Sequence, residues 1–210
     1  MANRERNQSR MTVEEYLRFE EQSDVRHEYV AGEIYAMSDG IGAMSGTTAR
    51  HNKIAANILV KLQPVAVRSN CEAYVNDMKV RAADDVFYYP DLVITCDQVR
   101  DADLTLLTPC LIVEITSPSS ERADRREKLT AYLAMPSVKS YIVIDQEVCL
   151  VQHHWRDESG GWKRDDLTGD KTITLQCLPT TLSLNEIYDR VEFPTQKERL
   201  RIREEAPTYG

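Results

Sequence analysis

Hydrophobic positions near the start of the chain follow two different periods, and each predicts a different element. After Thr12 and Glu15, which form a capping-box pair, apolar residues recur at helical spacing. A short amphipathic helix is therefore expected from Thr12. Strand-like residues then flank Ala31-Gly32, a dipeptide typical of a tight turn. This arrangement predicts a hairpin over His27–Met37.

A longer helical repeat comes next and is followed by three apolar segments typical of strands. Apolar residues at helical spacing predict a helix over Ala49–Leu62, which Pro64 is expected to end. The three strand segments are Cys71–Arg81, Val86–Thr95 and Leu111–Thr116. The last is continuous and apolar enough to be buried on both faces, so we expect it at the centre of a sheet.

The second half of the chain predicts a crossover unit with antiparallel strands added to it. A helix capped by Ser119 or Ser120 and running to Met135 precedes a second buried strand, Tyr141–Asp145. The alternating segments Val148–Trp155, Gly161–Leu167 and Thr172–Leu175 then read as an antiparallel extension of the same sheet. The predicted fold class is α/β (α+β), with a mixed central sheet flanked by helices and an N-terminal helix and hairpin.

Composition divides the chain into one folded domain and two polar ends. Residues 1–11 are expected to be a polar tail, 12–193 the domain, and 194–210 a charged tail. Hydrophobic residues make up 42% and charged residues 29%, as in globular proteins. No apolar run approaches the roughly 18 residues of a membrane span. We therefore expect a cytoplasmic protein with no membrane partner.

The number and spacing of the cysteines also favour the cytoplasm. The five cysteines are an odd number without C-x-x-C spacing, and most lie inside apolar stretches. Buried free thiols in a reducing compartment fit this pattern best. The residues are Cys71, Cys96, Cys110, Cys149 and Cys177.

Net charge limits how the protein could meet nucleic acid. The formal charge is -8, so the whole molecule does not attract polyanions. Binding to nucleic acid would therefore depend on local chemistry. A divalent cation held by carboxylates is one such means, because it offsets their charge near a phosphate.

Two carboxylates occupy the ends or interiors of buried strands. Asp91 follows Tyr89-Pro90 and opens an apolar run, and Glu114 lies inside Leu111–Thr116. An ionised group in an apolar strand costs several kcal/mol unless it is paired or binds a cation. Two carboxylates from adjacent strands suit Mg²⁺. The alternatives for Glu114 are a buried ion pair and a position on the solvent face of the sheet.

Two further residues have both a functional and a purely structural interpretation. Lys128 lies on the predicted crossover helix and shares a face with Asp124 and Tyr132. Taken alone, Lys128 and Asp124 form an ordinary surface pair. His51, in the first long helix, is by itself more typical of a hydrogen-bonded histidine than of a ligand.

Together these residues resemble the Uma2 family of the PD-(D/E)XK nuclease-like superfamily. The resemblance covers about Thr12 to Asp189 and implies a restriction-endonuclease-like core. It includes Glu28, the Gly32-Glu33 hairpin and His51. The remaining matching segments are Tyr89-Pro90-Asp91, Val113-Glu114-Ile115-Thr116-Ser117-Pro118-Ser119-Ser120, Asp124 with Lys128 and Tyr132, and Tyr141-Ile142-Val143-Ile144-Asp145.

The resemblance implies a role for each matching position. Asp91, Glu114 and the backbone carbonyl of Ile115 would hold Mg²⁺, with Mn²⁺ as a substitute. The superfamily's usual lysine, two residues after the acid, is absent because that position is Thr116. Lys128 is then the candidate catalytic cation. The remaining candidate site residues are an acid from the hairpin, Glu28 in preference to Glu33, together with His51 and Tyr132.

The function implied is that of a metal-dependent endonuclease that hydrolyses phosphodiester bonds of nucleic acid, with DNA as the expected partner. A homodimer is compatible with this function, because nucleases that cut both strands often pair two sites. The first alternative is a catalytically silent nuclease-fold module that binds DNA or another protein. The second is a structural domain whose acidic residues pair internally.

Overall fold

The computed structural model describes residues 10–37, 48–116, 122–195 and 198, except for the side chains of residues 122–125. Most of the two predicted tails and the predicted helix cap at Ser119 or Ser120 lie outside the described residues.

The described residues form helices and mixed sheets. A six-stranded sheet has the order β11-β10-β9-β8-β6-β3, and a five-stranded sheet has the order β2-β1-β5-β4-β7. None of the described helices is long and apolar enough to cross a lipid bilayer. The helices are α1 (Val13–Gln22), α2 (Ala49–Arg68), α3 (Arg122–Ala134) and α4 (Leu184–Ile187); the strands are β1 (His27–Val30), β2 (Glu33–Ala36), β3 (Glu72–Val75), β4 (Lys79–Ala83), β5 (Val86–Tyr88), β6 (Leu92–Thr95), β7 (Thr105–Leu106), β8 (Leu111–Thr116), β9 (Ser140–Asp145), β10 (Val151–Arg156), β11 (Trp162–Leu167), β12 (Thr172–Thr174) and β13 (Thr181–Ser183).

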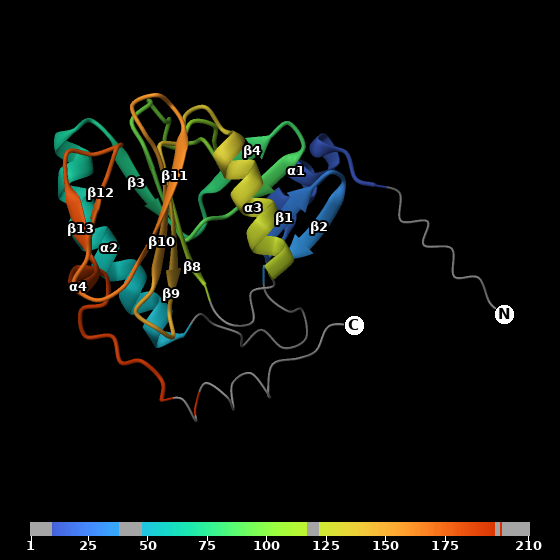
Figure 1. Cartoon of the computed structure of the whole chain (residues 1–210). Helices are drawn as coiled ribbons and strands as arrows, with labels where there is room; N and C mark the ends of the chain where they lie inside the picture. The colour runs from blue at the N-terminus through green and yellow to red at the C-terminus, as the bar shows by residue number, and fades with distance from the viewer. Residues whose placement is uncertain (1–9, 38–47, 117–121, 196–197, 199–210) are drawn as a thin grey trace.

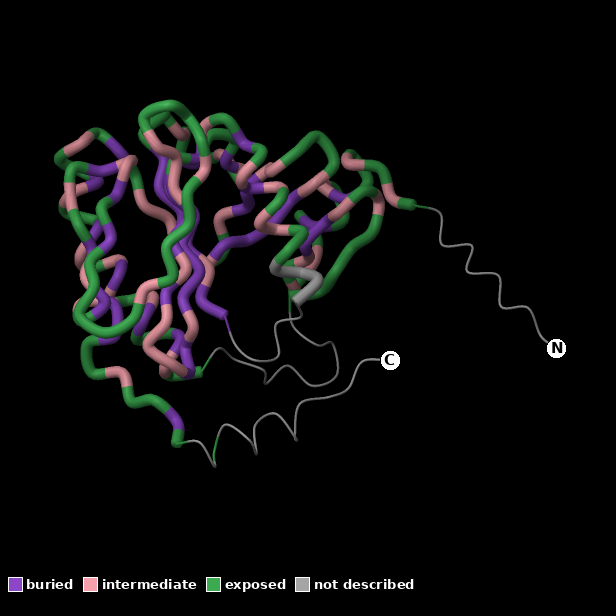
Figure 2. Tube along the Cα trace, in the orientation of Figure 1, coloured by how far each residue is buried: buried purple, intermediate pink, exposed green. Residues whose placement is uncertain are grey.

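Helices cover both faces of the six-stranded sheet. Figure 1 shows α2 on one side of β8 and β9 and α3 on the other. Alternate residues of β8 pack on the two sides: Leu111 and Val113 join the core under α2, whereas Ile112 joins the core under α3. The central strands are accordingly buried throughout most of their length (Figure 2).

The amino-terminal helix and the hairpin form as predicted. Thr12 Oγ1 accepts a hydrogen bond from Glu15 N at 3.2 Å, and Glu15 Oε2 accepts one from Thr12 N at 2.8 Å, which closes the capping box. The turn of the hairpin is Ala31-Gly32, with φ angles of 48° and 97°. Two consecutive positive φ angles suit the right-handed twist of a two-residue hairpin.

The prediction that Pro64 ends the second helix is wrong, because α2 continues through it to Arg68. Proline removes one backbone donor and frees the carbonyl four residues earlier, at Val60. Val60 is 75% exposed, so this turn faces water. Continued burial of Leu62 and Ala66 on the opposite face favours extending the helix.

Two segments predicted as single strands are each divided between the two sheets. The stretch Cys71–Arg81 gives β3 and β4, and Val86–Thr95 gives β5 and β6. Asn76 interrupts the first with a φ of 60°, and Pro90 interrupts the second because it lacks a backbone N–H. Asp91 consequently lies where the chain passes from one sheet to the other.

The predicted crossover unit is confirmed. The predicted antiparallel extension of the sheet is confirmed for its first two strands but not for the third. Strands β8 and β9 are parallel and are connected through α3. Strands β10 and β11 extend the sheet in antiparallel fashion. The prediction for Thr172–Leu175 is wrong, because β12 pairs with β13 in a separate two-stranded sheet.

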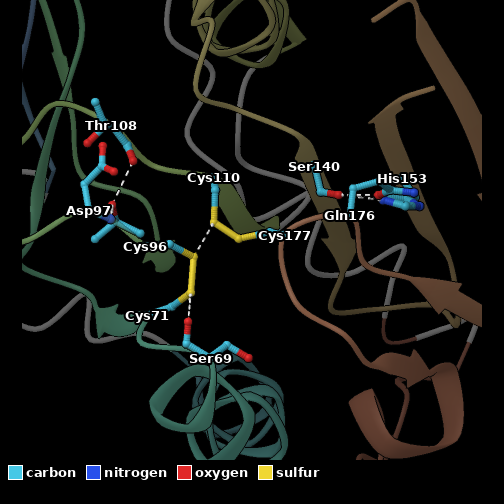
Figure 3. The surroundings of a disulfide bond; sticks show 11 residues. Ser69, Cys71, Cys96, Asp97, Thr108, Cys110, Ser140, His153, Gln176 and Cys177 are labelled. Carbon is cyan, nitrogen blue, oxygen red and sulfur yellow. Dashed lines mark hydrogen bonds between the residues drawn. A yellow bond between two sulfur atoms is a disulfide. The ribbon is translucent and has the colours of Figure 1, made fainter. Parts of the chain in front are cut away.

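The cysteines also differ from expectation. Cys71 is bonded to Cys96 and Cys110 to Cys177, and Cys149 is the free cysteine (Figure 3). Cys96 is exposed, and Cys177 and Cys149 are half-buried. The expectation of five buried free thiols is therefore wrong for four of them.

Candidate functional site

Asp91 and Glu114 come from facing positions on neighbouring strands. The antiparallel register of β6 and β8 pairs Leu92 with Val113, so its next step sets Asp91 opposite Glu114. Asp91 Oδ2 accepts a hydrogen bond from Ile115 N at 2.6 Å, which attaches the carboxylate to β8. The strand register thus sets the backbones of two acids that are 23 positions apart in the chain opposite each other.

His51 supports the second oxygen of Asp91. Its Nε2 lies 3.0 Å from Asp91 Oδ1, and the histidine is 7% exposed. An ionised carboxylate only accepts hydrogen bonds, so Nε2 carries the hydrogen. Thr48 caps the first turn of α2 by accepting a hydrogen bond from His51 N at 3.1 Å. Within the described chain the buried Nδ1 of His51 has no hydrogen-bond partner, which leaves it available to a ligand or water.

Glu114 faces α3. It lies two residues after Ile112, which packs on the α3 side of the sheet, and alternate residues of a strand share a face. Tyr132 of α3 donates a hydrogen bond from its hydroxyl to Glu114 Oε1 at 3.2 Å. Burial, reinforced by the charge of Glu114, holds the pKa of Tyr132 well above its usual value. The hydroxyl therefore stays protonated and orients the carboxylate.

Lys128 lies one helical turn before Tyr132 and is directed inward. Its Nζ lies 2.6 Å from Glu28 Oε1 of β1, and the two side chains are only 14% and 11% exposed. The ammonium also lies 5.4 Å from the centre of the Tyr88 ring, at a distance typical of a cation–π contact. The interpretation of Lys128 as a solvated surface lysine is therefore wrong. The side chain of Asp124, the suggested surface partner of Lys128, lies outside the part of the chain whose side chains the structure describes.

Of the two hairpin acids, Glu28 and not Glu33 contacts Lys128 in the described structure. Strand β2 is at the edge of the five-stranded sheet, and all four of its residues are exposed. Glu33 instead accepts a hydrogen bond from the hydroxyl of Tyr35 at 2.7 Å. Glu28 lies on β1, the inner strand of the hairpin, and reaches Lys128.

Thr116 lies two residues after Glu114 on β8. Its hydroxyl donates a hydrogen bond to the Ile144 carbonyl at 3.3 Å, and the residue is 9% exposed. Ile115 contacts Asp91 through its N–H. The suggested role of the Ile115 carbonyl stays a prediction.

Sequence reasoning missed a buried polar cluster that supports the chain just before Asp91. The Tyr89 hydroxyl donates a hydrogen bond to Glu20 Oε1 at 2.8 Å, and Glu20 Oε2 lies 3.1 Å from His27 Nδ1. Lys79, which is 5% exposed, lies near the rings of Tyr16 and Tyr89. Glu20 precedes Glu21 in the last turn of α1, and nothing in this local sequence indicates that Glu20 is buried.

A cleft of about 620 Å³ opens beside this cluster and is lined by Glu20, Lys79 and Tyr89 among others. The residues that line this cleft do not include Asp91, Glu114 or Lys128. The cleft and the site around Asp91 are therefore neighbouring but distinct features.

The oxygen donors at Asp91 and Glu114 suit a hard divalent cation. A carboxylate offers about four lone-pair positions on its two oxygens. Asp91 uses one on each oxygen, for His51 and for the Ile115 N–H, which leaves further lone pairs for coordination. Oxygen donors of this kind are the ligands that Mg²⁺ prefers.

Known proteins resemble the chain over most of its length. The family model Uma2, described as "Putative restriction endonuclease", matches residues 13–186. The uncharacterized protein slr1290 of Synechocystis sp. (strain PCC 6803) is 28% identical over 187 residues, which is 88% of this chain and 94% of that protein. A second uncharacterized protein of the same organism, sll1609, is 28% identical over 165 residues, which is 76% of this chain and 89% of that protein.

A solved structure is also similar. It is a crystal structure from Anabaena variabilis ATCC 29413, described as "a putative nuclease belonging to DUF820". The likeness covers 87% of this chain and 99% of that chain, with a TM-score of 0.67 and 14% sequence identity. At this identity the likeness shows a shared fold.

Proposed function

Because the chain belongs to the Uma2 family of putative restriction endonucleases, we propose that it is a Mg²⁺-dependent endonuclease that hydrolyses phosphodiester bonds of DNA. We further propose that residues 12–193 form a PD-(D/E)XK-type nuclease domain. The observation that carries the proposal is the strand register that sets Asp91 opposite Glu114, and the hydrogen bond from Ile115 N to Asp91 Oδ2 supports it. Lys128 lies on α3, the helix whose Tyr132 donates a hydrogen bond to Glu114.

Asp91 and Glu114 are the residues that would hold the cation. Two negative charges close together in a half-buried setting repel each other, and a divalent cation removes this repulsion. When bound, Mg²⁺ supplies Lewis acidity toward a phosphate oxygen and makes a water molecule more acidic. Mn²⁺, which accepts the same oxygen ligands, would substitute.

Lys128 would stabilise negative charge on the phosphate during cleavage. An ammonium is a donor of strong, charge-assisted hydrogen bonds to phosphate oxygens. Glu28 holds Lys128 in place through the 2.6 Å ion pair, and the Tyr88 ring limits its movement from another direction. A preorganised charge of this kind is worth more in a partly water-excluded site than in open solvent.

Tyr132 connects the proposed metal ligand to the helix that carries Lys128. Residues at positions i and i+4 lie on the same face of a helix, and Lys128 and Tyr132 both lie against the Tyr88 ring. The hydrogen bond from Tyr132 to Glu114 then sets the distance between α3 and β8. This contact would connect one proposed metal ligand to the helix that carries the proposed catalytic lysine.

The test of the proposed function is metal-dependent cleavage by the full chain. Purified protein is incubated with supercoiled plasmid, single-stranded DNA and RNA in the presence of Mg²⁺, Mn²⁺ or a chelator. We expect nicking or linearisation of the plasmid with Mg²⁺ or Mn²⁺, and none with the chelator. Binding to DNA without cleavage under every metal condition would contradict the proposal and support a silent DNA-binding module. Cleavage that persists in the chelator would show that no metal is required.

We also expect His51 to act as a positioning residue for Asp91. The change His51→Ala removes the hydrogen-bond donor to Oδ1, so the Mg²⁺ concentration for half-maximal cleavage should rise roughly 10–100-fold, as for other partners of metal ligands. The rate at saturating Mg²⁺ should stay within a few-fold of wild type. His51→Gln retains a donor and should restore part of the affinity. An unchanged Mg²⁺ requirement in His51→Ala would contradict this role.

A further inference from the structure

Three cysteines are brought to the same end of the six-stranded sheet by the register of its strands. Glu72 pairs with Thr95, so Cys71 before β3 meets Cys96 after β6. Ile94 pairs with Leu111, so Cys110, directly before β8, arrives at the same place.

The fourth cysteine, Cys177, comes from the connection between β12 and β13 and completes the group. Figure 3 shows the four sulfur atoms together. We name these four residues the cysteine cluster.

Three sulfur atoms of the cysteine cluster lie close enough to one another to meet at one metal ion, although Cys110 and Cys177 are bonded to each other in the disulfide form. Cys96 Sγ and Cys110 Sγ are 3.8 Å apart without being bonded to each other. The sulfurs of Cys96, Cys110 and Cys177 all lie within 4.8 Å of one another. In a tetrahedral zinc site the Zn–S distance of about 2.3 Å requires sulfurs that are about 3.8 Å apart.

We propose that the reduced chain binds one Zn²⁺ ion through Cys71, Cys96, Cys110 and Cys177. In the disulfide form these sulfurs are joined as Cys71–Cys96 and Cys110–Cys177. A dithiol reductant supplies two electrons and two protons to each disulfide and is itself oxidised to a disulfide. The four thiols then release four protons as they bind Zn²⁺ as thiolates.

Zinc is the metal that this ligand set favours. Thiolates are soft ligands that select Zn²⁺ over Mg²⁺. Four protein ligands leave no open coordination position, which is the arrangement of structural rather than catalytic zinc. Cys71 and Cys110 are 3% and 7% exposed, whereas Cys96 is exposed, so the cluster is shielded on the core side and accessible to metal from outside.

The cysteine cluster is separate from the proposed nuclease site. Cys96 follows β6 and Asp91 precedes it, so they lie at opposite ends of this strand. Zinc would join the ends of three neighbouring strands to the connection that carries Cys177. Its loss should therefore lower the stability of the fold without removing any residue proposed to act on DNA.

The zinc content and melting temperature of the full chain test this site. The protein is purified under a dithiol reductant without chelator, and zinc is measured by elemental analysis. The double variant Cys96→Ser/Cys177→Ser changes the two less buried cysteines, and Cys149→Ser is the matched control because Cys149 lies outside the cluster. We expect one zinc per chain in wild type and in the control, and its loss in the double variant.

Melting under the same reductant gives a second readout that needs no variant. Chelation should lower the melting temperature of the reduced wild type by roughly 5–15 °C, for a metal present at ~10³ times its dissociation constant, and added Zn²⁺ should restore it. The proposal would be overturned if the reduced wild type contained no zinc and if neither chelator nor Zn²⁺ changed its melting temperature. The role of the cluster would then be to form disulfides. Equal zinc in the double variant would also overturn it.

Discussion

We expect Glu114→Gln and Asp91→Asn each to lower the rate of the proposed metal-dependent DNA cleavage by roughly 10³-fold. Each variant removes the charge of one proposed metal ligand and nearly preserves its shape. A bound cation contributes several kcal/mol to transition-state stabilisation, and each 1.36 kcal/mol corresponds to a factor of about ten in rate. The measurement is the initial rate of plasmid cleavage in Mg²⁺ and in Mn²⁺, together with the affinity for Mn²⁺ by calorimetry.

The two variants differ in their expected effect on stability, which separates chemistry from folding. Gln at position 114 keeps an oxygen that can accept the hydrogen bond from Tyr132. Asn at position 91 must direct an amide donor toward either His51 or the Ile115 N–H, and an unmet donor there costs about 1–3 kcal/mol. Glu114→Gln is therefore the cleaner test.

The control for these variants is Asp84→Asn, because Asp84 is fully exposed in the turn before β5. It should retain the wild-type cleavage rate and melting temperature. Undiminished cleavage in both Glu114→Gln and Asp91→Asn would place the active site elsewhere on the molecule.

We expect Lys128→Met to lower the cleavage rate by roughly 10²–10³-fold, the usual cost of removing one preorganised charge stabiliser, and to leave the affinity for Mg²⁺ unchanged. Met retains an unbranched side chain over the Tyr88 ring but lacks the ammonium. An ammonium does not coordinate a metal ion, so the loss should appear in the rate at saturating metal. A full rate in Lys128→Met would exclude Lys128 as a catalytic residue.

The Lys128–Glu28 ion pair also stabilises the fold, and a double variant separates this role from catalysis. Breaking a buried pair by removing one partner can cost up to roughly 3–5 kcal/mol, so Lys128→Met should melt at a lower temperature than wild type. Lys128→Met/Glu28→Gln removes both charges and should recover much of that stability. It should not recover the cleavage rate. Recovery of both would show that Lys128 acts only through folding.

Glu33→Gln is the matched control for Glu28→Gln. The two acids come from the same hairpin, but Glu33 is exposed on the edge strand and contacts Tyr35. We expect Glu28→Gln to slow cleavage because Lys128 loses its ionic partner, and Glu33→Gln to have no effect. Equal losses in both variants would contradict the assignment of Glu28 to the site.

Local patterns in the sequence were sufficient for the elements with strong periodicity or capping. The Thr12–Glu15 capping box, the hairpin turn at Ala31-Gly32 and the crossover from β8 through α3 to β9 depend on residues close together in the chain. The position of Lys128 on the crossover helix followed from the same local signals, whereas the strand break before Asp91 did not, because Val86–Thr95 was expected to be one strand. These features are specified by backbone preferences and by the face that each element must bury.

Only the tertiary structure decided which residues meet. Strand period places Glu28 and Glu33 in one hairpin, but the choice between them depends on which strand is at the sheet edge. Helical period places His51 early in α2, but its contact with Asp91 depends on how α2 packs on the sheet. The spacing of the four cysteines in the sequence matches no motif. They come together only because the register of distant strands places them at the same end of the sheet. Pairing between distant segments is a property of the assembled sheets and is not encoded in any local period.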